Sequence, residues 1–241
     1  MKFVSYLKSI AVPALLAFSL VPAFAQEAAI RKNLAEKFPA FEKIDEVSKT
    51  PMNGLYEVRI GFNIFYTDEQ GNYLIEGHLM DVKNRRNLTE ERVEKLTAVD
   101  FEKLPIDGAI KTVRGDGKRK LAIFEDPNCG YCKQFERELT KVNNVTIYLF
   151  LYPMLGPDSY LKSRNIWCAK DKAKAWNDWM LRNTTPANAE CDVAPLKRNR
   201  EFGQKYNITG TPTLIFANGS RAPGAISAEE VEKMLVAAKN P

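Results

Sequence analysis

The amino-acid sequence predicts a protein of mixed class, α+β and α/β, built from two parts of different size. Residues 26–86 combine one amphipathic segment with short runs of alternating apolar and polar residues, which is typical of a small helix-plus-antiparallel-sheet domain. From residue 105 onward, strand-like and helix-like segments alternate, with one long helical stretch inserted among them. This alternation favours a mixed sheet with helices on both faces.

The first 25 residues are predicted to be a signal peptide. Lys2 and Lys8 form a basic start, an apolar run extends over residues 10–20, and Ala23-Phe24-Ala25 has the small-x-small pattern of a cleavage site. A membrane anchor is the alternative, but Pro13 interrupts the run, which is shorter than the roughly 20 residues that a spanning helix needs. We therefore expect export and cleavage after Ala25.

Composition argues against a nucleic-acid partner. The chain has 35 Lys and Arg against 30 Asp and Glu, a net charge of +5. Cleavage after Ala25 would leave 216 residues, enough for one large domain or two small ones. Their net charge would be +3. No block of five or six basic residues occurs, and Lys118-Arg119-Lys120 is expected at the solvated start of a strand.

The N-terminal domain, residues 26–86, is expected to begin with a helix over 26–40 that ends at Pro39. Ile30, Leu34 and Phe38 would share one face of this helix.

Two strand runs are predicted next, over 55–66 and 73–82, separated by a turn at Gln70-Gly71-Asn72. About 60 residues bury little surface on their own. Unpaired edge strands would then favour a homodimer through this domain, and packing on the second domain is the alternative.

Residues 87–104 are predicted to form a linker helix, with Asn87 and Glu90 at its start and the domain boundary at Pro105. A narrow apolar stripe is typical of a helix that bridges domains through solvent. The stripe consists of Leu88, Leu96, Val99 and Leu104.

The C-terminal domain, residues 105–241, is expected to contain three strands and four helical segments. The strands are predicted at 120–126, 145–152 and 213–217, and the helical segments at 129–142, 158–182, 196–206 and from Ser227, whose cap would include Glu230. Asn218-Gly219 predicts a hairpin turn after the last strand.

Four cysteines lie in the second half of the chain. An even number of cysteines in an exported protein favours disulfides. Cys129 and Cys132 are three residues apart, whereas 22 residues separate Cys168 from Cys191. The single histidine, His78, excludes multi-histidine metal sites and is expected at a surface or interface.

The segment Cys129-Gly130-Tyr131-Cys132 stands where a predicted strand gives way to a helix. At a helix N-terminus, free backbone N–H groups and the helix dipole favour a thiolate, the species that attacks disulfides. Zinc sites use the same spacing but need further ligands. Cys168 and Cys191 are too far apart for a second pair of that kind, so no metal is expected.

A second segment, Gly210-Thr211-Pro212-Thr213, precedes an apolar strand. Proline is allowed at the start of a strand, and a cis peptide there would mark a functional turn. An ordinary trans turn is the alternative, but the presence of the upstream cysteine pair favours the functional turn.

These segments, with Ile166-Trp167-Cys168-Ala169-Lys170-Asp171-Lys172 and Cys191-Asp192-Val193, resemble the bacterial periplasmic DsbC/DsbG disulfide-isomerase family across the chain that follows the signal peptide. The Gly-Tyr dipeptide between the cysteines is closer to DsbC than to DsbG.

The resemblance implies a thioredoxin-like C-terminal domain with a helical insertion. It implies that Cys129 is the exposed nucleophile, with Cys132 as the more buried resolving thiol and Gly130 and Tyr131 between them. Thr211-Pro212 would form the cis-proline loop that faces them, and Cys168 and Cys191 would form a structural disulfide.

The resemblance also implies the partners. They are misfolded disulfide-containing exported proteins as substrates, a membrane thiol reductase of the DsbD type as electron donor, and a second copy in a V-shaped homodimer joined through the N-terminal domain. The protein would work in the periplasm without a cofactor, with added chaperone activity. A net oxidant like DsbA and a holdase chaperone with incidental cysteines are the rival functions.

One position departs from the wider thioredoxin pattern. Many thioredoxins hold a buried acid six residues before the first cysteine, where this chain has Ile123. Glu125 stands at a different register and is expected at the surface, so no side-chain general base is predicted.

Overall fold

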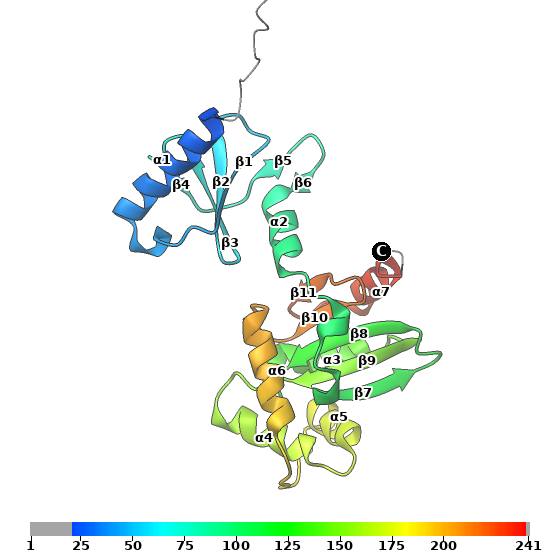
Figure 1. Ribbon diagram of the computed structural model, residues 1–241. Helices are drawn as coiled ribbons and strands as arrows, with labels where there is room; N and C mark the ends of the chain where they lie inside the picture. The colour runs from blue at the N-terminus through cyan, green and yellow to red at the C-terminus, as the bar shows by residue number, and fades with distance from the viewer. Residues whose placement is uncertain (1–20, 240–241) are drawn as a thin grey trace, which may run out of the picture. The chain divides into compact units, whose positions relative to one another are not determined.

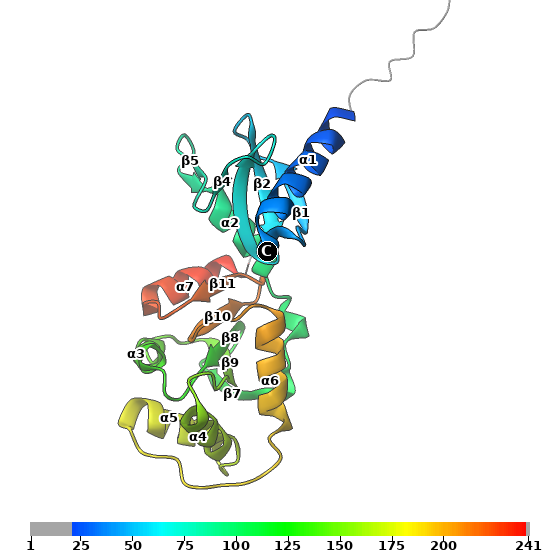
Figure 2. The same cartoon turned by 90° about the vertical axis from the view of Figure 1, so that its left-hand side faces the viewer.

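The computed structural model describes residues 21–239 (Figures 1 and 2). The chain divides into two compact units, the first ending at Leu79 and the second beginning at Met80. The predicted signal peptide lies mostly outside the described residues, and the expected cleavage site after Ala25 falls within the first helix and stays a prediction. Over the described range, no helix has both the length and the apolar character to cross a membrane.

The first unit packs one helix against a four-stranded antiparallel sheet. Ile30 and Leu34 are buried with Tyr56 and Val58, as the helical periodicity predicts. The strands follow one another in the order β1-β2-β3-β4. The elements are α1 (Val21–Lys37), the short 3-10 helix η1 (Pro39–Phe41), β1 (Glu46–Lys49), β2 (Leu55–Ile60), β3 (Asn63–Asp68) and β4 (Leu74–Ile75).

Three expectations for this unit are wrong. The run 73–82 is two short strands in different sheets, β4 and a strand at Met80–Asp81, instead of one strand. The helix ends at Lys37, so Phe38 has extended backbone and is 45% exposed instead of completing the apolar face. The run 55–66 is a hairpin rather than one strand, because Gly61 takes a positive φ of +60° and reverses the chain. The dense aromatic residues on both sides hide this turn in the sequence. Strand β1 was not predicted at all.

The segment after Met80 begins the second unit. It contains the paired strands β5 (Met80–Asp81) and β6 (Arg86–Asn87), then α2 (Leu88–Thr97), η2 (Phe101–Lys103) and η3 (Ile106–Gly108). The predicted helix start is confirmed, since the Asn87 side chain accepts a hydrogen bond from the Glu90 N–H. The helix itself is shorter than the predicted linker.

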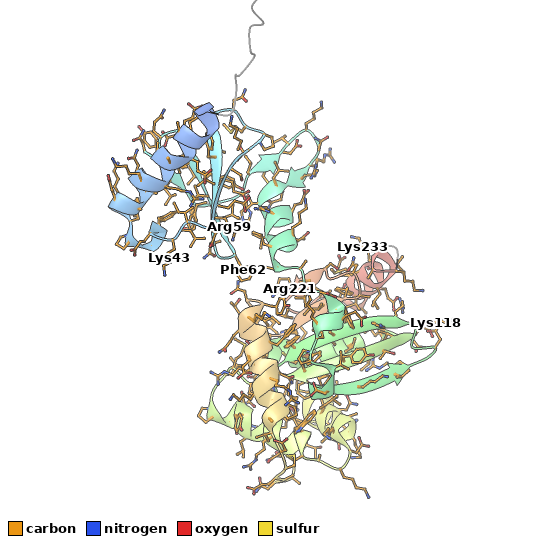
Figure 3. The ribbon with its side chains drawn as sticks, in the orientation of Figure 1. Lys43, Arg59, Phe62, Lys118, Arg221 and Lys233 are labelled. Carbon is orange, nitrogen blue, oxygen red and sulfur yellow. A yellow bond between two sulfur atoms is a disulfide. The ribbon has the colours of Figure 1, made fainter. Side chains whose placement is uncertain are left out.

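The end of the predicted linker is part of the second unit's core. Val99 and Leu104 are buried with Phe101, and the Val99 N–H donates to the Gly219 carbonyl. Arg221, labelled in Figure 3, adds a hydrogen bond to the Thr97 carbonyl. The interpretation of residues 98–104 as solvent-bridging helix is therefore wrong, because these apolar residues follow the helix instead of lining it.

The second unit is built on a five-stranded sheet of order β11-β10-β8-β9-β7, in which only β8 and β9 run parallel. The strands are β7 (Ala109–Arg114), β8 (Arg119–Glu125), β9 (Val145–Leu151), β10 (Thr213–Phe216) and β11 (Arg221–Pro223). The helices are α3 (Gly130–Leu139), α4 (Pro157–Trp167), α5 (Lys172–Arg182), α6 (Ala194–Lys205) and α7 (Ala228–Ala237). Strand β7 was not predicted.

Alternation along β8 divides the core between the two faces of this sheet. Leu121 and Ile123 pack with residues of α3 and α7. Ala122 and Phe124 pack on the opposite face, where Phe124 stacks on Phe202 of α6. Figure 2 shows α3 and α6 on opposite faces of the sheet. Side chains of β8 two residues apart therefore face the same helices.

The helical stretch predicted over 158–182 is two helices. Asp171 separates them, because its side chain accepts from the Lys174 N–H and starts α5. The last helix begins as predicted, with the Ser227 side chain accepting from the Glu230 N–H. The hairpin predicted at Asn218-Gly219 joins β10 and β11.

Candidate active site

The loop between β8 and α3 is fixed by the buried side chain of Asp126. Its carboxylate accepts hydrogen bonds from the backbone N–H groups of Asn128, Met154 and Leu155, at 2.7, 2.7 and 2.9 Å, and from the Ser159 hydroxyl at 2.7 Å. The chain that follows β8 is thus tied to the chain that follows β9. This anchoring places the next residues at a defined helix start.

Cys129 is the N-cap residue of α3, and Cys132 lies one turn into the helix. Both thiols are free. The Cys132 N–H donates to the Cys129 sulfur at 3.2 Å, and the Cys129 thiol donates to the Thr211 carbonyl at 3.2 Å. A backbone N–H aimed at sulfur stabilises a thiolate, so the geometry suits Cys129 as the attacking group.

The expected exposure of Cys129 is wrong, and the two cysteines differ little in burial. Cys129 is 5% exposed and Cys132 is fully buried. Cys129 is shielded because the Thr211 carbonyl lies against its sulfur. Burial raises the pKa of the Cys132 thiol strongly, and the nearby Glu125 carboxyl adds to this effect.

The other predicted loop residues surround this pair. The Thr211–Pro212 peptide bond is cis and directly precedes β10. Pro212 is buried, and its carbonyl accepts from the Gly224 N–H. Gly130 and Tyr131 are exposed, Tyr131 by 70%, so the outer side of the cysteine pair faces solvent.

Cys168 and Cys191 are joined in a disulfide, with Cα atoms 5.5 Å apart. The bond links the C-terminal cap of α4 to the segment before α6. Beside it, the Trp167 indole N–H donates to the Asp192 carbonyl at 3.1 Å. The disulfide therefore closes the helical insertion on itself, and neither of its sulfurs contributes to the Cys129–Cys132 pair.

Sequence reasoning missed a contact between this insertion and the cysteine loop. The Trp179 indole N–H, on α5, donates to the Pro127 carbonyl at 2.6 Å. The ammonium groups of Lys133 and Lys162 lie 4.0 and 4.8 Å from the centre of the Trp179 ring. Burial lowers the pKa of Lys133. No local motif marks this contact, because the two partners are 52 residues apart.

The expectation for Glu125 is wrong. Its side chain is fully buried, and neither carboxyl oxygen has a hydrogen-bond partner among the described residues. Burial raises the pKa of Glu125 well above its usual range, and the neighbouring Glu136 carboxyl raises it further. The alternation of β8 could have revealed this, because Glu125 follows Leu121 and Ile123 on the face covered by α3.

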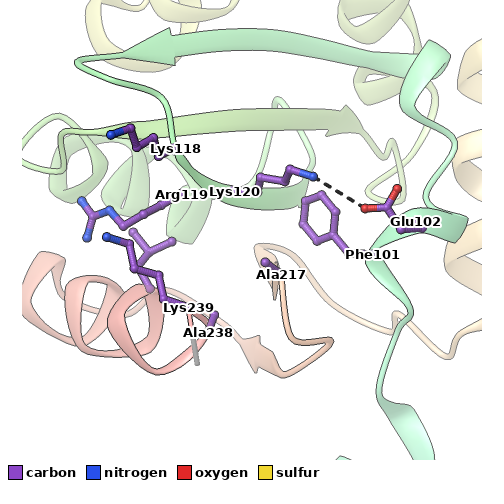
Figure 4. A pocket seen from close by; sticks show the side chains of 9 residues that line it. Phe101, Glu102, Lys118, Arg119, Lys120, Ala217, Ala238 and Lys239 are labelled. Atoms are coloured by element: carbon purple, nitrogen blue, oxygen red, sulfur yellow. Dashed lines mark ion pairs between the residues drawn. The ribbon is translucent and has the colours of Figure 1, made fainter. Parts of the chain in front are cut away.

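Residues 21–239 hold no group of three His, Cys, Asp or Glu side chains placed to bind a metal ion. A pocket of about 310 Å³ lies at the start of β8, opposite the strand end that leads to Cys129 (Figure 4). Two cations lining it are already paired, Lys120 with Glu102 and Arg119 with Glu232.

Comparisons with known proteins match both units. The family model of the disulfide bond isomerase protein N-terminal domain matches residues 21–90, and that of the thioredoxin-like domain matches residues 106–239. A solved disulfide interchange protein from Neisseria gonorrhoeae is 38% identical, with a TM-score of 0.54 over 57% of this chain and 100% of that chain.

Two curated relatives extend the similarity over most of the chain. A probable thiol:disulfide interchange protein DsbC from Bordetella pertussis is 48% identical, covering 87% of this chain and 74% of the relative. The thiol:disulfide interchange protein DsbC of Escherichia coli is 28% identical, covering 90% and 93%. The predicted family and the thioredoxin-like fold are thus confirmed. The chain belongs to the DsbC family of thiol:disulfide interchange proteins.

Proposed function

We propose that this protein rearranges incorrect disulfides in exported proteins of the bacterial periplasm. The observation that carries the proposal is the pair of free thiols at the start of α3, with the Cys129 sulfur between the Cys132 N–H and the Thr211 carbonyl. The names of the DsbC relatives support the same reaction type.

The reaction is thiol–disulfide exchange. The Cys129 thiolate attacks a substrate disulfide, one substrate sulfur leaves as a thiolate, and a mixed disulfide forms. The freed substrate thiolate then attacks another disulfide, which rearranges the substrate. Alternatively, Cys132 attacks Cys129 and releases the substrate reduced. The pair must then be reduced again, for which a membrane thiol reductase of the DsbD type is the proposed electron donor.

A homodimer through the N-terminal unit is part of the proposal. The match to the N-terminal domain of disulfide bond isomerases over residues 21–90 supports it. The sheet of this unit leaves β1 and β4 as edge strands that a second copy could pair with. A dimer would hold a large substrate between two reactive pairs for several rounds of exchange.

Refolding of a scrambled protein with several disulfides tests the proposal. Reduced enzyme in catalytic amounts should restore the substrate's activity, and the Cys129→Ser variant should not. A net oxidant would instead act on a fully reduced substrate when supplied in its disulfide form. If the protein acts on the reduced substrate and not on the scrambled one, it is an oxidant and the proposed isomerase function is wrong.

Chaperone activity is a second candidate function. Large apolar side chains are exposed beside the Asp126-anchored loop, among them Met154 at 41% and Leu155 at 56%. Exposed apolar groups of this kind bind unfolded segments. The double variant Cys129→Ala, Cys132→Ala should then still suppress aggregation of a substrate without cysteines. Aggregation equal to that without the protein would rule this function out.

A further inference from the structure

Trp179 takes no part in the exchange steps, although it contacts the loop that carries Cys129. It lies on α5 of the helical insertion, and its indole N–H donates to the Pro127 carbonyl at 2.6 Å. Pro127 is buried and stands two residues before Cys129, the N-cap of α3. Because a proline has no backbone N–H, it cannot fix this segment by donating a hydrogen bond of its own. The insertion therefore holds the loop through a carbonyl directly before the reactive site.

The next residue of the loop, Asn128, is also held from the insertion. Its side-chain amide donates to the Asp158 carboxylate of α4 at 2.7 Å. Asp158 forms an ion pair with Lys162, one turn further along α4. The Lys162 ammonium in turn lies 4.8 Å from the centre of the Trp179 ring. Contacts thus run from the Asn128 amide through α4 and α5 back to the neighbouring carbonyl, and they form a closed circuit at the start of α3.

The Trp179 ring is held by cations from two helices. The Lys133 ammonium, from α3, lies 4.0 Å from the ring centre and donates to the Asn183 side chain at 2.8 Å. Burial and the Lys162 ammonium both lower the pKa of Lys133, so the two cations repel each other across the same indole. An indole face attracts cations more strongly than other aromatic rings do. These contacts hold the plane of the ring and therefore the direction of its N–H.

The position of Cys129 matters because its sulfur has two partners with defined directions. The Cys132 N–H donates to it at 3.2 Å, and the thiol donates to the Thr211 carbonyl at 3.2 Å. Hydrogen bonds weaken steeply when they are misaligned, and the bond from a backbone N–H to a thiolate is among the stronger kinds. A loop that could shift at Pro127 would therefore present a less stabilised thiolate.

We propose that Trp179 is a positioning residue for thiol–disulfide exchange. By holding the Pro127 carbonyl, its indole N–H keeps Cys129 at the N-cap, where the Cys132 N–H stabilises the thiolate. Stabilising the thiolate favours the reduced form of the pair, so losing this contact shifts the equilibrium toward the Cys129–Cys132 disulfide. The inference rests on the proposed function, because both concern the same cysteine pair.

The test uses the full-length protein with Trp179→Phe, which keeps an aromatic ring for the two ammonium groups and removes the N–H donor. The reduced protein is equilibrated with glutathione disulfide, which takes two electrons from the cysteine pair and is released as two thiols. The equilibrium constant for disulfide formation should rise about fivefold, the size of effect expected for the loss of one hydrogen bond. Labelling of Cys129 by iodoacetamide at neutral pH should slow by a similar factor.

Trp167→Phe is the matched control. It also removes an indole N–H of the insertion that donates to a backbone carbonyl, that of Asp192 at 3.1 Å, beside the structural disulfide. A merely structural role of Trp179 predicts the same equilibrium constant and labelling rate for both variants. We expect only Trp179→Phe to change these two quantities. Equal values in the two folded variants overturn the proposal.

A second measurement does not depend on whether Trp179→Phe folds. The chain has three tryptophans, and Trp167→Phe and Trp176→Phe identify their indole N–H signals in the NMR spectrum of the wild type. The Trp179 signal should move when the pair changes from dithiol to disulfide, whereas the Trp167 signal should stay. A Trp179 signal that moves no more than that of Trp167 overturns the proposal. A wild type whose Cys129 reacts with neither glutathione disulfide nor iodoacetamide would instead contradict the proposed function.

Discussion

The second unit holds two cysteine pairs in opposite chemical states. Cys129 and Cys132 are free thiols at a strand-to-helix junction, next to a buried acid. Cys168 and Cys191 form a disulfide at the edge of the helical insertion, where Cys191 is exposed. The chemistry around each sulfur distinguishes the pairs. A helix N-terminus makes one pair reactive, whereas the other only closes a loop.

The largest expected effect comes from the reactive pair. Cys129→Ser should reduce isomerase activity to the uncatalysed level, because no attacking thiolate remains. Cys132→Ser should instead accumulate mixed disulfides with substrate, visible on non-reducing gels. Alkylation of the reduced native protein should label Cys129 before Cys132, which is fully buried. Faster labelling of Cys132 would reverse the two roles.

Removing the first unit tests whether the activity of the reactive pair depends on dimer assembly. A protein that begins at Met80 keeps both cysteine pairs and the buried Val99. It should be monomeric by sedimentation, reduce small disulfides at the wild-type rate, and lose most of its activity on scrambled substrate. A monomeric wild type, or full isomerase activity in the truncated protein, would contradict the dimer.

The other pair should matter for stability. Removing both sulfurs with Cys168→Ala and Cys191→Ala opens a loop with a sequence separation of 23. The chain-entropy model gives a loss of about 3 kcal/mol in the free energy of unfolding, measured with urea. Exchange by Cys129 should persist where the variant is folded. In mild reductant, the wild type should have two free thiols, those of Cys129 and Cys132. Four free thiols in a folded protein would show that the second pair is not a stable disulfide.

The smallest effect is the pH dependence due to Glu125. Burial raises its pKa in the folded protein, so the folded state binds more protons than the unfolded one above the ordinary carboxyl range. Wild-type stability therefore falls as pH rises from that range toward the raised pKa. Glu125→Gln lacks this loss, and its advantage should grow by at most about 1.4 kcal/mol per pH unit.

Glu138→Gln is the control variant for the sign of this pH dependence of stability. The Lys141 ammonium lowers the pKa of Glu138, so this carboxylate stabilises the folded state above its ordinary range, and its removal should have the opposite pH dependence. Urea unfolding at several pH values measures both variants. A constant difference between Glu125→Gln and wild type would show that Glu125 does not titrate in the folded protein.

The sequence predicts features that depend on local residues. The caps at Asn87 and Ser227 and the hairpin at Asn218-Gly219 each follow from neighbours in the chain, and the structure confirms them. The cysteine loop and Thr211-Pro212 could be named because their motifs are short. How the two segments meet, with the Cys129 thiol on the Thr211 carbonyl 82 residues away, depends on the pairing of β8 with β10.

The failures concern contacts over long distances along the chain. Val99 and Leu104 look like part of a thin helical stripe, but both are buried in the second unit, where the Val99 N–H donates to the Gly219 carbonyl. Glu125 looks like a surface acid because charge normally indicates exposure, whereas the alternation of its strand places it under α3. Trp179 carries no signal of its contact with Pro127. In each case tertiary packing overrides a local expectation.

Two adjacent acids at the end of β8 also fix the register of the sheet. Asp126 has four hydrogen-bond donors around its carboxylate, whereas Glu125, on the other side of the backbone, has none among the described residues. A slip of one residue would exchange the faces of these side chains. It would strip Asp126 of its donors and turn the Glu125 carboxyl away from the α3 face, so a misregistered sheet would be unstable and would lose the anchored loop that carries Cys129.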